Sequence, residues 1–144
     1  MNISRLVFPS LANAYRKLDE PSIALLRFVA GAALITHGWG KIQDPTAMAG
    51  FLENMGFWPG AFWSFMVAIT ESVGGLLLAI GLLTRPAALL NLINMSVIIW
   101  FHWIFKEEGY GGAEKAILWW VILFYFVVHG GQYYAVDKAM KREF

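Results

Sequence analysis

The chain has 144 residues, of which 58% are hydrophobic and 15% are charged, and its formal net charge is +1. A typical soluble domain has about 25% charged residues, so this composition excludes an ordinary soluble enzyme and favours a membrane protein. The chain has no cysteine, which excludes disulfides, thiolate metal sites and dithiol redox chemistry carried out by the protein itself.

The N-terminal region differs from the rest of the chain. Residues 4–18 place apolar side chains at helical spacing next to basic residues, a pattern typical of a helix that lies on a membrane surface. Pro21 follows and favours the start of a new helix, because proline at the first helical position loses no hydrogen bond. We therefore predict an interfacial segment over residues 1–21 and a transmembrane domain over residues 22–140.

Four apolar stretches fill this domain. Each has about 20 residues, which at about 1.5 Å of rise per residue matches a hydrocarbon core of about 30 Å. They cover residues 22–41, 62–83, 87–105 and 116–136. We expect an all-α, integral membrane four-helix bundle with a short amphipathic N-terminal helix. In the loop between the first two stretches, the helical spacing of apolar residues predicts one short helix.

Basic residues are distributed unevenly between the two ends of these stretches. The segments before the first stretch, between the second and third, and after the fourth hold Arg5, Arg16, Lys17, Arg85, Lys138, Lys141 and Arg142. The opposite side holds Lys41, Lys106 and Lys115 together with several carboxylates. Cytoplasmic loops carry the excess of lysine and arginine, so we predict that both termini are cytoplasmic.

Each apolar stretch carries ionisable or amide side chains. A charge at the bilayer centre costs on the order of 3 kcal/mol, so such groups usually face the bundle interior and mark function. Helical spacing places the polar residues of each stretch on one face. From these faces we predict one interior polar cluster made of Arg27, Glu71, Asn91, Asn94 and His129.

The partner of Glu71 within this cluster has two candidates. Arg27 could pair with Glu71, because a buried arginine next to a carboxylate recovers much of its desolvation cost. Its guanidinium could instead donate to Asn91 and Asn94. Lys41 is the other candidate partner of Glu71. Either ion pair would stabilise helix packing, whereas a weakly paired Glu71 could carry a proton or hydrogen-bond a ligand.

Two histidines, His37 and His102, are expected at a similar depth toward the non-cytoplasmic end of the bundle. Two imidazoles could ligate a b-type haem axially, or a metal ion. Two histidines at one depth arise easily by chance, and the sequence shows no second pair. We therefore expect interfacial hydrogen bonding at these residues, with no metal site and no haem.

Three strings in the chain are characteristic when taken together: RFVAGAALITHGWGKIQDP, FLENMGFWPG and ESVGGLLLAIGLLTRPAAL. They resemble the DoxX family of small bacterial four-span membrane proteins, and the resemblance covers most of residues 22–140. The closing string GGQYYAVDKAM is similar to the end of the family pattern, with Asp137 in place. It departs from that pattern at Gln132, where a basic residue is common, and at Tyr134, where serine is common.

The resemblance implies a multi-pass protein of the bacterial cytoplasmic (inner) membrane that associates with redox partners. The family takes its name from a subunit of a terminal quinol oxidase or thiosulfate:quinone oxidoreductase system, and it assigns no catalytic residue to this chain. We therefore expect an accessory or anchor subunit of a quinone-linked redox system, not an enzyme on its own. Its expected partners are the lipid bilayer and a redox protein, or a second copy of the chain, and no nucleic acid.

A quinone is the cofactor that fits this expectation. A quinone site needs one or two hydrogen-bond donors and an apolar, aromatic wall. The candidate quinone or ligand contacts are His37, Lys41, His102 and Glu114. The alternative function is a small transporter or binding protein for a lipid-like or weakly acidic molecule, held at mid-depth by Arg27 and Glu71.

Overall fold

The structure is a computed structural model that describes residues 7–142. Predictions that concern Arg5 and the other residues of 1–6 lie outside the described residues. Helices account for the described secondary structure, and no strand occurs between residues 7 and 142. In chain order the elements are η2 (Pro9–Leu11), α1 (Ala12–Gln43), α2 (Ala49–Asn54), α3 (Gly60–Ile80), α4 (Thr84–Trp100), the π-helix η3 (Phe101–Phe105), α5 (Gly109–His129) and α6 (Val136–Ala139).

The N-terminal amphipathic segment is helical, but it is continuous with the first apolar stretch. Helix α1 has 32 residues and contains Pro21 in its interior. Proline lacks the N–H that would bond one turn back. Pro21 is exposed, so the carbonyl left without that partner can meet water or headgroups. The prediction that Pro21 opens a new helix is therefore wrong, and the boundary drawn between residues 21 and 22 falls inside α1.

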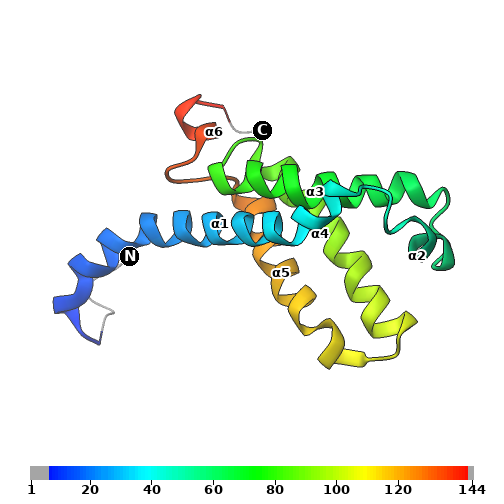
Figure 1. The fold of residues 1–144 in the computed structure, drawn as a ribbon. Coiled ribbons are helices and arrows are strands. Elements are labelled where there is room, and N and C mark those ends of the chain that lie inside the picture. The colour runs from blue at the N-terminus through cyan, green and yellow to red at the C-terminus, as the bar shows by residue number, and fades with distance from the viewer. Residues whose placement is uncertain (1–6, 143–144) are drawn as a thin grey trace.

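Helices α1 and α3 form the first of two hairpins and lie side by side across Figure 1. Small residues allow their backbones to approach closely, as is usual between membrane helices. A Cβ atom on Gly31 would lie 2.5 Å from the carbonyl oxygen of Gly75, and one on Gly38 would lie 2.7 Å from the backbone nitrogen of Ser72. These two close approaches set the register of α1 on α3.

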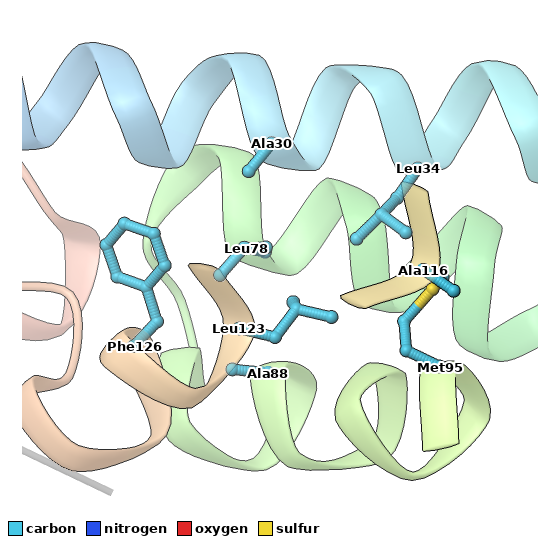
Figure 2. Close-up of a cluster of buried hydrophobic side chains, with 8 residues drawn as sticks. All are labelled: Ala30, Leu34, Leu78, Ala88, Met95, Ala116, Leu123 and Phe126. Atoms are coloured by element: carbon cyan, nitrogen blue, oxygen red, sulfur yellow. The ribbon is translucent and has the colours of Figure 1, made fainter. Parts of the chain in front are cut away.

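Helices α4 and α5 form the second hairpin, which crosses the first and extends away from it in Figure 1. Contacts between α3 and α4 join the two hairpins. The core lies where the hairpins cross, and Figure 2 shows its side chains converging from both of them. Its buried members are Ala30, Leu34, Leu78, Ala88, Met95, Ala116, Leu123 and Phe126.

Within residues 7–142, three helical segments are long and apolar enough to cross a membrane: Gly60–Ile80, Thr84–Phe105 and Gly109–His129. Helix α1 is longer than any of them and packs along α3. Many large apolar side chains face outward, as lipid contact requires, including Phe28, Leu76 and Leu118. The prediction of an all-α membrane helix bundle is confirmed. The cytoplasmic location of the termini stays a prediction.

The ends of the apolar stretches differ from the prediction in two places. Helix α5 starts at Gly109 and ends at His129, so the predicted span over 116–136 is displaced. Gly130 stops the helix with φ of +70°, a conformation that favours glycine. Gln132 follows with φ of +51°, just before a turn at residues 133–134. In addition, residues 84–86, which separate the predicted second and third stretches, are already part of α4, and the connection between the two helices lies at residues 81–83. The short helix predicted in the first loop is confirmed as α2.

Candidate functional site

A mainly apolar pocket of about 360 Å³ lies between the two hairpins. Helices α1, α3, α4 and α5 and the π-helix η3 each contribute to its wall. The pocket is partly open, and its volume falls in the range of small-molecule sites, about 300–1,000 Å³. It is lined by Leu34, His37, Lys41, Glu71, Met95, Ile98, His102, Gly112, Lys115, Ala116 and Trp119.

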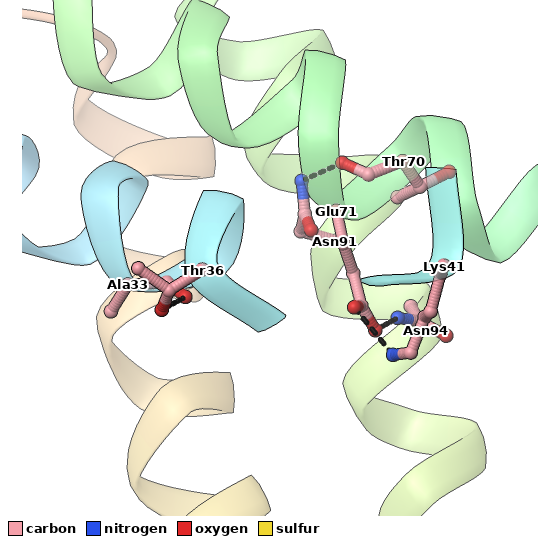
Figure 3. A network of polar contacts seen from close by, with 7 residues as sticks. All are labelled: Ala33, Thr36, Lys41, Thr70, Glu71, Asn91 and Asn94. Atoms are coloured by element: carbon pink, nitrogen blue, oxygen red, sulfur yellow. Dashed lines mark hydrogen bonds and ion pairs between the residues drawn. The ribbon is translucent and has the colours of Figure 1, made fainter. Parts of the chain in front are cut away.

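Glu71, on α3, is the most deeply buried ionisable group of this pocket, with 1% of its surface exposed. The Nζ atom of Lys41 donates to its Oε2 at 2.5 Å, and the Nδ2 atom of Asn94 donates to its Oε1 at 3.0 Å. Figure 3 shows both side chains converging on the carboxylate. Both carboxylate oxygens are therefore bonded, and the charge is balanced by an ammonium group.

The close approach of α1 to α3 brings Lys41 to Glu71. Gly38 packs directly on the backbone of Glu71 and on Ser72. Lys41 follows Gly38 by three residues and so lies on the same helical face, about one turn further along. Of the two candidate partners of Glu71, the structure thus selects Lys41, whose side chain remains 29% exposed at the pocket.

Asn91 is fully buried between α3 and α4 and holds these helices together. Its Nδ2 atom donates to the carbonyl oxygens of Thr70 and Ala87, both at 3.0 Å. Gly74 makes room for it, because a Cβ atom there would lie 2.7 Å from that nitrogen. Asn91 therefore belongs to the helix interface next to Glu71, and it is absent from the pocket wall.

Arg27 lies elsewhere, and its predicted pairing with Glu71, Asn91 or Asn94 is wrong. Its guanidinium is buried and donates to the carbonyl oxygens of Gly131, of Tyr133 at 2.9 Å and of Tyr134 at 2.8 Å. Because α5 ends early, the chain folds back and presents carbonyl groups that have no helical partner. Arg27 and Lys41 are also about 20 Å apart along α1, given a rise of about 1.5 Å per residue.

Asp137 is a buried structural residue that was not among the predicted site residues. Its Oδ1 atom accepts from the backbone N–H of Leu83 at 2.8 Å, and its Oδ2 atom accepts from the N–H and hydroxyl of Thr84 at 2.9 and 2.8 Å. It therefore caps the start of α4 from a distant part of the chain, where helices favour a carboxylate. Asp137 also interacts electrostatically with Arg27. The closing string GGQYYAVDKAM, which contains Asp137, was the sequence signal that could have identified this residue.

His37 and His102 both line the pocket, as the quinone prediction requires. His102 lies in the π-helix η3, a type of distortion that is frequent at functional sites. Its Nδ1 atom is 2.5 Å from Glu108 Oε2, and Lys106 Nζ donates to Glu108 Oε1 at 3.0 Å. The contact with His102, followed by that with Lys106, lowers the pKa of the Glu108 carboxyl below its ordinary value.

Two predicted site residues lie outside these clusters. Glu114 is exposed and does not line the pocket, whereas the adjacent Lys115 does. Each helical residue advances about 100°, so Glu114 faces away from the stripe of α5 that contains Lys115 and Trp119. His129 is exposed at the last position of α5, where it stacks on Tyr125 and contacts that residue's carbonyl oxygen at 3.0 Å. The predicted interior cluster is thus divided into separate sites.

Comparison with known proteins places the chain in a family. A sequence model described as DoxX matches residues 22–103, which include Arg27, Glu71 and Asn91. The chain belongs to the DoxX family. The inner membrane protein YqjF of Escherichia coli is 33% identical over 93 residues, which cover 64% of this chain and 70% of that protein. An uncharacterized protein of Haemophilus influenzae is 31% identical over 132 residues, covering 88% of this chain and 96% of its own length.

A more distant relative carries a functional name. The Bacillus subtilis protein named "Putative oxidoreductase CatD" is 27% identical over 122 residues, covering 84% of this chain and 88% of that protein. No solved structure matches the chain significantly. Within residues 7–142, no group of three or more His, Cys, Asp or Glu side chains is arranged to hold a metal ion. The family and the fold together describe a DoxX membrane protein.

Proposed function

We propose that this protein is an accessory or anchor subunit of a quinone-linked redox system in the bacterial inner membrane. The pocket between its hairpins would hold the quinone ring. The observation that carries this proposal is the meeting of His37, Lys41 and His102 at one mainly apolar pocket of about 360 Å³. These residues come from α1 and η3, which are far apart in the sequence.

The lining matches the chemistry of a quinone ring. A quinone presents two carbonyl oxygens, which accept hydrogen bonds, on a flat apolar ring. Lys41 is a fixed charged donor because Glu71 holds it, and the two imidazoles supply further donors. Trp119 and the aliphatic side chains of Leu34 and Ile98 form the wall against which such a ring would pack. When bound, the quinone would supply reversible two-electron chemistry.

The accessory role follows from what the chain itself can contribute. It has no cysteine, so dithiol chemistry would reside on a partner protein. The name of the CatD relative, an oxidoreductase by designation, supports a redox association. We therefore propose that the residues of this chain bind and orient the quinone while a partner redox protein exchanges electrons with it.

The alternative function is binding or transport of a lipid-like, weakly acidic molecule. The presence of Lys41 and Lys115 in the same pocket favours it, because an anionic head would find two ammonium groups there. This alternative requires that a long-chain fatty acid compete for the pocket. It also predicts that uptake into vesicles containing the protein is lost in Glu71→Gln.

A titration of tryptophan fluorescence tests the proposal. A short-chain quinone quenches nearby indoles, so the wild type should be quenched on titration, and the change should be smaller in Trp119→Phe. His37→Phe and His102→Phe should each weaken quinone binding about two- to twelvefold, because each removes one hydrogen bond worth about 0.5–1.5 kcal/mol. His129→Phe is the matched control, since His129 lies outside the pocket.

Two results would contradict this proposal. If both pocket histidine variants bind the quinone as the wild type does, the ring is not held between the hairpins. If a long-chain fatty acid binds with a strong dependence on Lys115 while the quinone does not bind, the transport alternative replaces the redox role.

A further inference from the structure

The imidazole of His102 has a carboxylate partner that does not line the pocket. His102 lies in the pocket wall, whereas Glu108 is absent from it. The Nδ1 atom of His102 is 2.5 Å from the Oε2 atom of Glu108. Because Nδ1 is occupied by this contact, Nε2 is the ring nitrogen of His102 that is left for a ligand.

The loop between η3 and α5 is built to hold this carboxylate in place. The backbone N–H of Glu108 donates to the carbonyl oxygen of His102 at 3.0 Å, and Glu107 adopts φ of +56°, which is uncommon for a residue other than glycine. Gly112 leaves the space that the carboxylate fills, because a Cβ atom there would lie 2.4 Å from Oε2. Lys106 donates to Oε1 at 3.0 Å. Both carboxylate oxygens are therefore fixed.

The carboxylate determines where the His102 ring carries its proton. The contact with His102, followed by that with Lys106, lowers the pKa of Glu108, so its carboxylate is ionised at neutral pH and can only accept. The proton of the neutral ring is then on Nδ1, since the partner of one ring nitrogen sets the state of the other. Nε2 is left as an acceptor in the neutral ring and becomes a donor only in the imidazolium.

The other polar groups of the pocket make this acceptor unusual. Lys41 and Lys115 line the pocket, and an ammonium group can only donate. Glu71 accepts through both of its oxygens from protein groups. A hydroquinone has two hydroxyl groups, each of which donates and accepts, whereas a quinone has two carbonyl oxygens, which only accept. A hydroquinone can therefore accept from Lys41 and also donate to His102.

We propose that Glu108 is a positioning residue that keeps Nε2 of His102 as a hydrogen-bond acceptor, so that at about pH 8, where histidine is mainly neutral, the pocket prefers hydroquinone to quinone. This inference rests on the proposed function and names the redox state of its ligand. At lower pH the imidazolium donates to a quinone carbonyl, so the same side chain can meet both forms of the ring.

Nuclear magnetic resonance of the ligand-free full chain, labelled with 15N-histidine in detergent at about pH 8, tests the role of Glu108. The ring signals of His102 are assigned by their loss in His102→Gln. We expect them to show the proton on Nδ1 in the wild type, and on Nε2, which free histidine favours, in Glu108→Ala. Glu107→Ala is the matched control and should leave them unchanged. If wild type and Glu108→Ala show the same tautomer, Glu108 only supports the start of α5 and the proposal is wrong.

Titrations with a short-chain quinone and its hydroquinone, followed by tryptophan fluorescence without oxygen at about pH 8, test the preference. We expect the wild type to bind the hydroquinone at least about twofold more tightly, the effect of one hydrogen bond. Glu108→Ala and His102→Phe should lose this preference, and Glu107→Ala should keep it.

The results separate this inference from the proposed function. If the wild type binds both forms equally, or if Glu108→Ala keeps the preference, the selection of hydroquinone is wrong while the quinone pocket stands. If neither form binds, the proposed function is wrong and the selection of hydroquinone fails with it.

Discussion

At the residue scale, the charged side chains that are buried between residues 7 and 142 each have specific hydrogen-bond partners. Glu71 is bonded through both oxygens to Lys41 and Asn94. Arg27 is bonded to carbonyl groups of the returning chain. A charge buried in a helix bundle is tolerated only with such partners, and removing one partner costs more than the pair contributes. The two sites can therefore be tested separately.

Replacing Lys41 tests the Glu71 site. Lys41→Met leaves a buried carboxylate without its counter-charge, so we expect the free energy of unfolding to fall by about 2–4 kcal/mol. The double variant Lys41→Met/Glu71→Gln should recover much of this loss, because the unpaired charge is gone. Thermal unfolding in detergent, followed by circular dichroism, measures both. Lys115 lines the same pocket but is outside the ion pair, so Lys115→Met should change the free energy of unfolding by less than about 0.5 kcal/mol. If Lys115→Met is as destabilising as Lys41→Met, the loss does not come from the Lys41–Glu71 ion pair.

The lowered pKa of Glu108, which lies outside the spans, predicts that stability depends on pH. Its pKa is lowered by the contact with His102 and then by that with Lys106. A carboxyl whose pKa is lower in the folded state stabilises the fold above its unfolded pKa, and this contribution is lost as the pH falls through the folded pKa. We expect the melting temperature of the wild type to fall below a pH near the ordinary value of 4.5. Glu108→Gln should show less of this fall, whereas Glu107→Gln should keep it.

At the scale of elements, the close contact of α1 with α3 positions the pocket. Gly38 is in contact with the backbone of α3, and Lys41 reaches Glu71 one turn later. The π-helix η3 and the start of α5 then bring His102 and Lys115 to the opposite wall. A change in the spacing between the two helices would therefore disturb both the ion pair and the pocket.

Alanine at Gly38 tests this spacing. A Cβ atom there would lie 2.4 Å from the hydroxyl oxygen of Ser72 and 2.7 Å from its backbone nitrogen, so α1 must move away from α3. We expect a loss of about 1–3 kcal/mol in the free energy of unfolding, together with weaker ligand binding. Gly40 is the matched control, because nothing lies within 4 Å of a Cβ atom at that position. Gly40→Ala should keep or slightly raise stability, since alanine favours helix. Equal losses in both variants would contradict the close-contact account.

At the scale of the whole molecule, the two crossed hairpins place the pocket lined by His37 and His102 toward one end of the spans and the turn after α5 at the other end. If α1 crosses the membrane together with the three other apolar segments, both termini lie on the same side. The excess of lysine and arginine on that side predicts that it is the cytoplasm. The pocket between the hairpins would then lie toward the outer half of the bilayer.

Cysteine labelling tests this topology, because the chain has no cysteine of its own. Single variants Ser10→Cys, Glu107→Cys and Met140→Cys place one thiol near each terminus and one in the loop before α5. A membrane-impermeant thiol reagent applied to spheroplasts should label only the variant at position 107. If the Ser10→Cys variant is labelled and the Met140→Cys variant is not, α1 does not cross the membrane.

Several features could be predicted from the sequence because they depend on local patterns. Apolar runs of membrane-spanning length predicted the helices, and polar residues at helical spacing predicted that Glu71 and Asn91 face neighbouring helices. His37, Lys41, His102 and Glu114 were the candidate quinone or ligand contacts. The first three line one pocket and Glu114 does not, and binding of a ligand there stays a prediction.

The sequence by itself determined the membrane class, the helical content and the family of this protein, since each follows from composition, periodicity or short strings that resemble a family pattern. The tertiary structure decided which polar groups meet. Whether Arg27 reaches Glu71 or the chain after α5 depends on where Gly130 ends that helix, and whether Lys41 reaches Glu71 depends on the approach at Gly38. These contacts join residues distant in the sequence, and helical spacing constrains only which side of its own helix each residue faces.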